Sequence, residues 1–457
     1  MVFWKMDKAG RDRASRPAAP NMPRRMGALV FCLVLFLSVW AVPARARVYI
    51  DIDQPFAKKL PVAVPAFMPL SGEGAGEGGF AESLTQRMTG NLDRCGIFVV
   101  LDPRTFIEGN PRAGLSLKEQ INFREWLTIG AELLIKGAYT AYGDELSLEL
   151  RLFDAFEGRM MLGKRYTGSI QDARKMINLF TNEILYVLTG ERGVFGSQIV
   201  FVGKSGGHKD LFVAEFGGDE PRQLTQSPGN STLPVVSRDG GRVIYQTRAP
   251  REYQVRVADM SGGSQVVHGG KALLLSPAFM PGGGYLVSIS GRYSTHIHRL
   301  DAQGKIQGQV TRFGTINISP SVSPEGSQMA YVSNQAGGPQ VYISSITGEG
   351  SRRVTMYGRE NTDPCWSPRG DRIVYVGNSR DIFTIKPDGT DVQQLTSDSG
   401  ANTRPSWSPD GRMIVFASTR LGRPALFTMS ANGEKQTPLL PDYEGVQSTP
   451  FWSPAKP

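Results

Sequence analysis

One serine of the chain stands in a pattern that is typical of a catalytic nucleophile. Ser205 lies in Gly203-Lys-Ser-Gly-Gly207, which fits the G-x-S-x-G pattern of hydrolases. That pattern exposes the hydroxyl only where a strand precedes the serine and a helix follows it. Here the sequence joins two short strands, so we expect Ser205 to lie in a loop. An exported hydrolase or lyase is the alternative function, although no attached hydrolase domain follows Pro454.

Two histidines and two cysteines are the remaining candidates for chemistry. His296 and His298 fall on one side of an expected strand and could bind a metal, but a third ligand is not evident. We therefore favour a pair of histidines on a strand surface. Cys95 and Cys365 fall in different expected domains, and we interpret both as buried free thiols. The sequence thus predicts no catalytic residue, no metal site and no cofactor, and a protein that is not an enzyme.

A repeated sequence pattern indicates which strands and turns surround several of these residues. The stretch Pro405-Ser-Trp-Ser-Pro-Asp-Gly-Arg-Met-Ile-Val-Phe-Ala-Ser418 predicts a short strand, a tight turn and a second strand. Related stretches follow one another at spacings of 41 to 45 residues. Such a period, with several strands in each unit, is typical of a β-propeller. The copies begin at Pro234, Pro277, Pro320, Pro364 and Pro405, with a truncated copy at Pro450.

The two ends of this array complement each other. Gln198–Thr225 supplies a unit without its first strand, and Pro450–Pro454 supplies a first strand without the rest of its unit. Joined, they complete one blade and cover sheet edges that would otherwise pair with other chains. We therefore expect a six-bladed β-propeller over residues 195–457, closed by strands from both ends of the repeat array.

The chain begins with a pattern typical of an export signal. Arg24 and Arg25 precede an apolar run of 14 residues, Leu29–Val42, and Pro43-Ala-Arg-Ala46 fits a cleavage site. We expect cleavage after Ala46, with residues 1–46 as the signal peptide. The run is short for a bilayer span, which disfavours an uncleaved anchor, so the mature protein is not expected to be membrane-embedded.

The charge of the chain sits mostly in this signal. Residues 1–46 carry eight Lys/Arg and two Asp, which is +6 of the net charge of +9. The remainder is therefore only weakly basic. Nucleic-acid binding is not expected, because it calls for basic residues clustered on the folded surface.

Residues 47–190 predict a separate α/β domain. Phe80–Leu92 and Asp172–Leu188 have helical spacing of apolar residues, and several strands lie between them. The fold class is therefore α+β multidomain: an N-terminal α/β domain followed by the propeller.

The start of the mature chain has strand periodicity. Its apolar residues and its polar residues alternate. We expect a mobile N-terminal segment, residues 47–56, that can pair with the sheet edge of a partner. The alternative is a plain edge strand or a frayed end. The alternating residues are Arg47, Val48, Tyr49, Ile50, Asp51, Ile52 and Asp53.

The repeated Pro-x-Trp-Ser-Pro-x-Gly unit resembles the propeller repeat of the TolB family. The segment Arg47–Asp53, the apolar stretch Pro61–Phe67 and the junction Leu188-Thr-Gly-Glu-Arg-Gly-Val-Phe195 are similar to that family as well. The resemblance covers nearly the whole mature chain. It implies a monomeric binding hub in the periplasm of Gram-negative bacteria, within the Tol–Pal system that maintains the outer membrane and draws the envelope inward at division.

The resemblance also implies partners and sites. The partners are a Pal-like peptidoglycan-associated lipoprotein and a TolA-like inner-membrane protein, and colicins exploit the propeller surface in some bacteria. The TolA contact would be the segment Arg47–Asp53. The Pal contact would lie on the propeller face that carries the loops between blades, where the resemblance implies Asn361, Thr362 and Asp363. By blade symmetry we add Asn402, Thr403, Arg404, Ser448 and Thr449.

Overall fold

The computed structural model describes residues 59–71, 79–107, 110, 112–115, 120–205, 207–218, 220–226 and 229–453. These described residues belong to one compact unit. The signal peptide, the cleavage site at Ala46 and the segment Arg47–Asp53 lie outside them, so those predictions stay predictions. No helix among the described residues combines the length and the apolar character needed to cross a bilayer.

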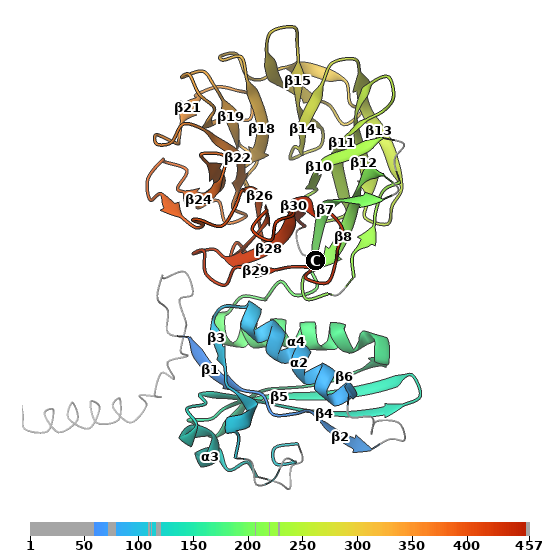
Figure 1. Ribbon diagram of the computed structural model, residues 1–457, viewed down its shortest axis with the longest axis vertical. Coiled ribbons are helices and arrows are strands. Elements are labelled where there is room, and N and C mark those ends of the chain that lie inside the picture. Colours follow the sequence, from blue (N-terminus) through green and yellow to red (C-terminus); the bar gives the residue numbers. More distant parts are fainter. Residues whose placement is uncertain are drawn as a thin grey trace, which may run out of the picture. The chain divides into compact units, whose positions relative to one another are not determined.

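The first part of the chain forms a six-stranded mixed sheet (Figure 1). The strand order is β3-β1-β4-β5-β6, and β2 also pairs with β4. The pairs β1–β3, β1–β4 and β2–β4 are parallel, whereas β4–β5 and β5–β6 are antiparallel. The strands are β1 (Leu60–Ala63), β2 (Met68–Ser71), β3 (Phe98–Val100), β4 (Leu133–Tyr142), β5 (Glu145–Asp154) and β6 (Arg159–Ser169).

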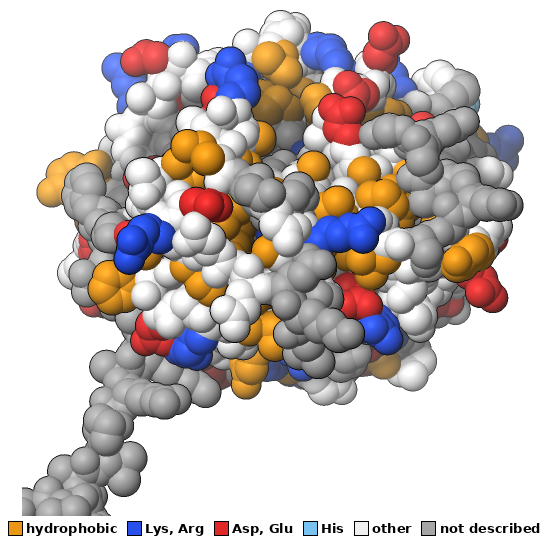
Figure 2. All heavy atoms as spheres, turned by 90° about the horizontal axis from the view of Figure 1, so that it is seen from below, with side chains coloured by type: hydrophobic (Ala, Val, Ile, Leu, Met, Phe, Trp, Pro, Cys, Tyr) orange, Lys and Arg blue, Asp and Glu red, His pale blue; other side chains and the backbone are white. Residues whose placement is uncertain are grey.

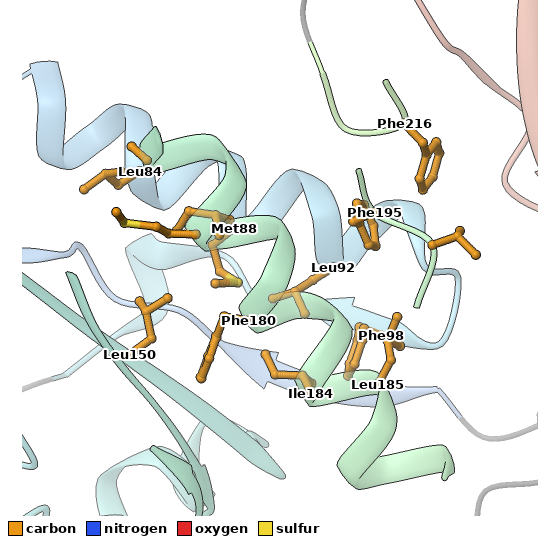
Figure 3. Packing of buried hydrophobic residues seen from close by; sticks show 14 of the residues in the cluster. Leu84, Met88, Leu92, Phe98, Leu150, Phe180, Ile184, Leu185, Phe195 and Phe216 are labelled. Atoms are coloured by element: carbon orange, nitrogen blue, oxygen red, sulfur yellow. The ribbon is translucent and has the colours of Figure 1, made fainter. Parts of the chain in front are cut away.

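Helices cover both faces of this sheet (Figure 1). On one face, α2 places Leu84, Met88 and Leu92 at a spacing of four residues, so that they lie along one side of the helix and are buried. Figure 3 shows them beside Phe180 and Ile184 of α4. The helical elements are α2 (Gly79–Arg94), η1 (Pro103–Thr105), α3 (Phe123–Thr128, on the opposite face), η2 (Ile170–Asp172) and α4 (Ala173–Thr189).

Helix α4 ends where the chain leaves the first domain. Gly190 has φ of 78° and donates its N–H to the carbonyl of Tyr186 at 2.8 Å, which is a glycine cap in the left-handed region. A side chain in that conformation would be strained. The cap therefore stops the helix and turns the chain toward the propeller.

The rest of the chain forms six four-stranded antiparallel sheets, the blades. The first three are β10 (Asn230–Val236), β11 (Arg242–Arg248), β12 (Tyr253–Asp259), β13 (Ser264–Gly270); β14 (Leu274–Phe279), β15 (Tyr285–Ser290), β16 (Thr295–Leu300), β17 (Ile306–Gln309); and β18 (Asn317–Val322), β19 (Gln328–Ser333), β20 (Gln340–Ser345), β21 (Arg352–Arg353). The last three are β22 (Asn361–Trp366), β23 (Ile373–Gly377), β24 (Asp381–Ile385), β25 (Gln393–Gln394); β26 (Asn402–Trp407), β27 (Met413–Ser418), β28 (Ala425–Ser430), β29 (Thr437–Pro438); and β30 (Ser448–Trp452), β7 (Gln198–Ser205), β8 (His208–Glu215), β9 (Arg222–Gln223).

The sixth blade joins the two ends of the repeat array. Its strand order is β30-β7-β8-β9, so the last strand of the chain pairs with the first strand of the propeller. Trp452 is buried and donates its indole N–H to Ser197 Oγ at 2.8 Å. The predicted six-bladed propeller, with one blade shared between the ends, is therefore confirmed.

The two domains share one apolar cluster and a group of ion pairs. The cluster of α2 and α4 continues through Phe195 and Phe216 (Figure 3). Trp452 belongs to the same cluster. Beside it, Glu191 Oε2 lies 2.9 Å from a terminal nitrogen of Arg369 and 3.0 Å from one of Arg412. Because the apolar cluster crosses the junction, the propeller is held on the first domain by burial as well as by charge.

Candidate partner-binding face

The inner strand of each blade runs from one face of the propeller to the other. It begins after the loop that joins two blades and ends at a tight turn before the second strand. Since the strands of a blade alternate in direction, the loop between the second and third strands lies on the same face as the loop between blades. We call this face the loop face; its described loops include residues 249–252, 271–273, 291–294, 310–316, 334–339, 354–360, 378–380, 395–401, 419–424 and 439–447. The opposite face, which carries the tight turns, is the turn face.

The two asparagines predicted to contact a partner are buried. Asn361 is 2 % exposed and donates its amide to Gln340 Oε1 at 2.6 Å and to the carbonyl of Tyr357 at 2.7 Å. Asn402 is fully buried, donates to the carbonyl of Arg380 at 3.0 Å, and accepts from Arg420 at 3.2 Å. Both amides are engaged within the propeller, which favours a role in holding the loops over contact with a partner.

A threonine at the end of each of four blades joins this polar network. Its hydroxyl accepts the backbone N–H of the residue 14 positions earlier, on the third strand, at 2.9 to 3.0 Å. The threonine hydroxyl thereby takes the place of a backbone carbonyl as the acceptor for this N–H group. The four residues are Thr225, Thr311, Thr355 and Thr396.

His296 belongs to one of these networks rather than to a metal site. Its Nδ1 lies 3.2 Å from the amide nitrogen of Asn317 and 3.4 Å from the hydroxyl of Thr311. Burial, followed by the charge of His298, lowers the pKa of His296. The described residues hold no group of three or more His, Cys, Asp or Glu that could bind a metal ion.

Six residues around the propeller axis share a strained backbone conformation. Each one precedes the first proline of a repeat, and each has φ between 44° and 56°. The left-handed region is uncommon for residues other than glycine, and a following proline favours extended backbone instead. In every blade the ladder register skips this residue and its proline, which forms a bulge. We call these residues the axial ring: Leu233, Ser276, Ser319, Asp363, Arg404 and Thr449.

The axial ring lines a cavity of about 990 Å³ that extends along the inner strands toward the turn face. Asp363 Oδ1 lies 3.2 Å from Arg404 Nε, and these two side chains are 16 % and 31 % exposed. The hydroxyls of Ser276 and Ser319 lie 3.4 Å apart. The hydroxyl of Thr449 is enclosed and has no hydrogen-bond partner among the described residues. The axial ring therefore carries polar groups that do not make all the hydrogen bonds of which they are capable.

The other predicted contact residues lie next to this ring. Thr403 is exposed, while Thr362 and Ser448 are half-buried. They precede Arg404, Asp363 and Thr449 on the inner strands β26, β22 and β30, which pack side by side. The structure thus brings six of the eight predicted residues together at the loop-face end of the axial cavity.

Sequence reasoning missed the exposed aromatic residues of the loop face. Tyr293 is 80 % exposed, Phe313 68 %, and Tyr357 83 %. Met356 and Leu421 are exposed on the same face. These five residues are spread over four loops of the loop face, and we regard them as candidates for contact with another protein. In the sequence, their exposure is indicated only by their position: they fall outside the alternating pattern of the strands, in loops that contain glycine and arginine.

These loops are held in place by hydrogen bonds between them. Asn334 Oδ1 accepts from the backbone N–H groups of Thr315 and Ile316, each at 2.8 Å. Asn378 Oδ1 accepts from the N–H of Arg359 at 3.1 Å. Because the loops are already ordered by the propeller, binding there would cost less conformational entropy than binding to free loops.

The loop face carries both signs of charge. Its exposed charged residues are Arg251, Lys271, Arg292, Arg312, Arg359 and Arg380, together with Glu252, Glu360, Asp398, Asp442 and Glu444. At the end of the molecule seen in Figure 2, Lys/Arg and Asp/Glu side chains are likewise mixed with apolar ones. Charge alone therefore does not distinguish the loop face.

The structure places Ser205 differently from the expected loop. It is the last residue of β7, and β8 begins at His208 as the next strand of the same hairpin. The predicted loop at Ser205 is therefore shorter than expected. A strand and not a helix follows the serine, so the surroundings of a nucleophile elbow are missing.

Comparisons with known proteins agree with this architecture. Residues 48–161 match the model of the TolB amino-terminal domain, and residues 186–456 match the model of the TolB beta propeller domain. A protein named TolB homolog from Chlorobium luteolum is 35 % identical over 430 residues, which cover 92 % of this chain and 97 % of that protein.

Two further comparisons differ in coverage. The Tol-Pal system protein TolB of Desulfosudis oleivorans is 35 % identical over 265 residues, 58 % of this chain and 60 % of that protein. The crystal structure of TolB from Acinetobacter baumannii is similar with a TM-score of 0.75 and 22 % identity, over 87 % of this chain and 97 % of that one. At this identity the likeness concerns the fold.

Proposed function

The chain belongs to the TolB family, and on this premise we propose that it is a periplasmic binding hub of a Tol–Pal system. In this role it binds a Pal-like peptidoglycan-associated lipoprotein and a TolA-like inner-membrane protein. The assembly supports outer-membrane integrity and envelope constriction during division. The protein acts by binding and positioning its partners, without catalysis.

One observation carries the proposal: the loop face presents exposed aromatic side chains on loops that hydrogen bonds hold in place. Tyr293, Phe313 and Tyr357 are the strongest candidates for the lipoprotein contact, because aromatic residues dominate the energetics of protein interfaces. Thr362, Asp363, Thr403, Arg404, Ser448 and Thr449 surround the axis on this side and complete the proposed contact.

Calorimetry with the soluble domain of the Pal-like lipoprotein from the same genome tests this proposal. The double variant Phe313→Ala with Tyr357→Ala is expected to lower the affinity by roughly a hundredfold, since each aromatic anchor is worth about 1–2 kcal/mol or more. Phe156→Ala is the matched control, because Phe156 is 84 % exposed in the N-terminal domain. Absence of binding by the wild-type chain, or an equal loss in the control, would reject the proposal.

The contact with a TolA-like protein is assigned to the segment Arg47–Asp53 and has its own test. Deleting Arg47–Gln54 is expected to abolish binding of the TolA-like protein while the lipoprotein still binds. Binding of the TolA-like protein that survives the deletion would reject this assignment.

A further inference from the structure

The axial ring contains an arginine whose donors are mostly unused. The Nε of Arg404 lies 3.2 Å from Asp363 Oδ1, and neither of its terminal NH2 groups has an acceptor among the described residues. A guanidinium has five N–H donors in a planar fork that matches a carboxylate with two parallel bonds. The contact with Asp363 is an ion pair through Nε, so the terminal NH2 groups of the fork remain open to a second carboxylate.

The neighbours of Arg404 in the ring leave room for such a ligand. Asp363 lies on one side in the preceding blade, and Thr449 lies on the other side in the following blade, with its hydroxyl unpaired. The remaining ring members Leu233, Ser276 and Ser319 are uncharged. Because the six bulges fix the backbone at these positions, the donors are held in place before a ligand arrives.

Arg404 is also within reach of a partner on the loop face. Strand β26 begins on that face at Asn402, so Arg404 is its third residue and lies about 7 Å below the start of the strand. An acidic side chain at the tip of a partner's loop can span this depth.

We propose that the axial ring is a binding site for a single carboxylate, which an acidic side chain of the lipoprotein inserts from the loop face. Arg404 exchanges its ion pair with Asp363 for two hydrogen bonds to the incoming carboxylate, and the hydroxyl of Thr449 donates a third. In the free protein Asp363 occupies the arginine and competes with the partner. This inference rests on the proposed function and names the chemistry that the loop face would recognise.

The two members of the ion pair then have opposite effects on binding. Asp363→Asn removes the competing charge and its repulsion of the incoming carboxylate. Asparagine also tolerates the left-handed backbone at this position, where φ is 51°. Arg404→Gln removes the fork itself. A purely structural ion pair would instead make both variants bind more weakly.

Calorimetry of the chain from Arg47 onward with the soluble domain of the lipoprotein measures these effects. Arg404→Gln is expected to weaken binding by roughly tenfold or more, as for a lost hydrogen bond to a charged group. Arg404→Lys is expected to fall between wild type and Arg404→Gln, because lysine keeps the charge and lacks the fork. Asp363→Asn is expected to strengthen binding by roughly two- to fivefold at low salt.

The matched controls remove the same charges on the turn-face side of the propeller. Arg372 and Asp391 form an ion pair there, so Arg372→Gln and Asp391→Asn are expected to leave the affinity unchanged. Circular dichroism checks whether each variant keeps the wild-type melting profile. Weaker binding by Asp363→Asn, or unchanged binding by Arg404→Gln, would overturn the axial carboxylate site. If the loop-face double variant loses binding in the same experiment, the proposed function still stands; if the wild-type chain does not bind, both fail.

Discussion

Replacement of Asn402 by alanine distinguishes a structural residue from a contact residue. The amide is fully buried and donates to the carbonyl of Arg380 at 3.0 Å and to Ser399 Oγ at 3.1 Å. Its oxygen accepts from the guanidinium of Arg420 at 3.2 Å. Two neutral bonds at about 1 kcal/mol each and one charged bond at about 1.5 kcal/mol give an expected loss of about 3–4 kcal/mol on Asn402→Ala.

Thermal unfolding measures this loss. For a propeller of this size, 1 kcal/mol corresponds to roughly 2–4 °C, so Asn402→Ala is expected to lower Tm by roughly 10 °C. The neighbouring residue provides the control: Thr403 is exposed, and Thr403→Ala is expected to change stability by less than about 0.5 kcal/mol. A Tm for Asn402→Ala within about 2 °C of wild type would refute the reasoning, and a lower partner affinity at unchanged Tm would make Asn402 a contact residue after all.

Two further predictions concern titratable groups. His296 has a folded-state pKa below its ordinary value of 6.5, so the unfolded chain binds more protons in the window between the two values; stability is complete above about pH 6.5 and falls as the pH is lowered through that window. Thermal unfolding measured from pH 8 to pH 5 should therefore show a steeper loss of Tm for wild type than for His296→Gln. Glutamine is chosen because Gln340 stands at the equivalent position of another blade. Equal slopes of Tm against pH would contradict the structure. Cys95 and Cys365 are free and half-buried, and desolvation raises the pKa of each thiol. Both should therefore react slowly with a disulfide reagent at pH 8 and fully after unfolding; rapid labelling of the native protein would contradict this expectation.

The propeller could be predicted because its repeat is visible in the sequence. The prolines recur at 41 to 45 residues, and the incomplete units at Gln198 and Pro450 each lack what the other supplies. A closed ring then satisfies both, as the pairing of β30 with β7 confirms. The period of a repeat is a local property of the chain, and local patterns are what sequence reasoning detects best.

The backbone of the axial ring could not be predicted in this way. Its members differ in type, from Leu233 to Asp363 and Arg404, and the residue before a proline is expected to be extended. The left-handed conformation arises because six inner strands pack around one axis and each must bulge. This constraint comes from the closure of the six blades and cannot be recognised in the sequence of a single repeat.

The exposure of the candidate contact residues could be predicted only in part, for a similar reason. Asparagine suits both an exposed turn and a buried network, so Asn361 and Asn402 could not be assigned to either from residue type. Phe313 and Tyr357 could equally have been core residues. Their exposure follows from the direction of the loops, which depends on the closed propeller.

Hydrogen–deuterium exchange tests the central claim, that the loop face binds the lipoprotein, most directly. The chain is compared alone and in complex with the soluble domain of the Pal-like lipoprotein. The account predicts slower exchange in residues 310–316 and 355–360 of the loop face, where Phe313 and Tyr357 are exposed. It also predicts unchanged exchange in the tight turns of the turn face. Protection confined to the turn face or to the N-terminal domain would contradict the account.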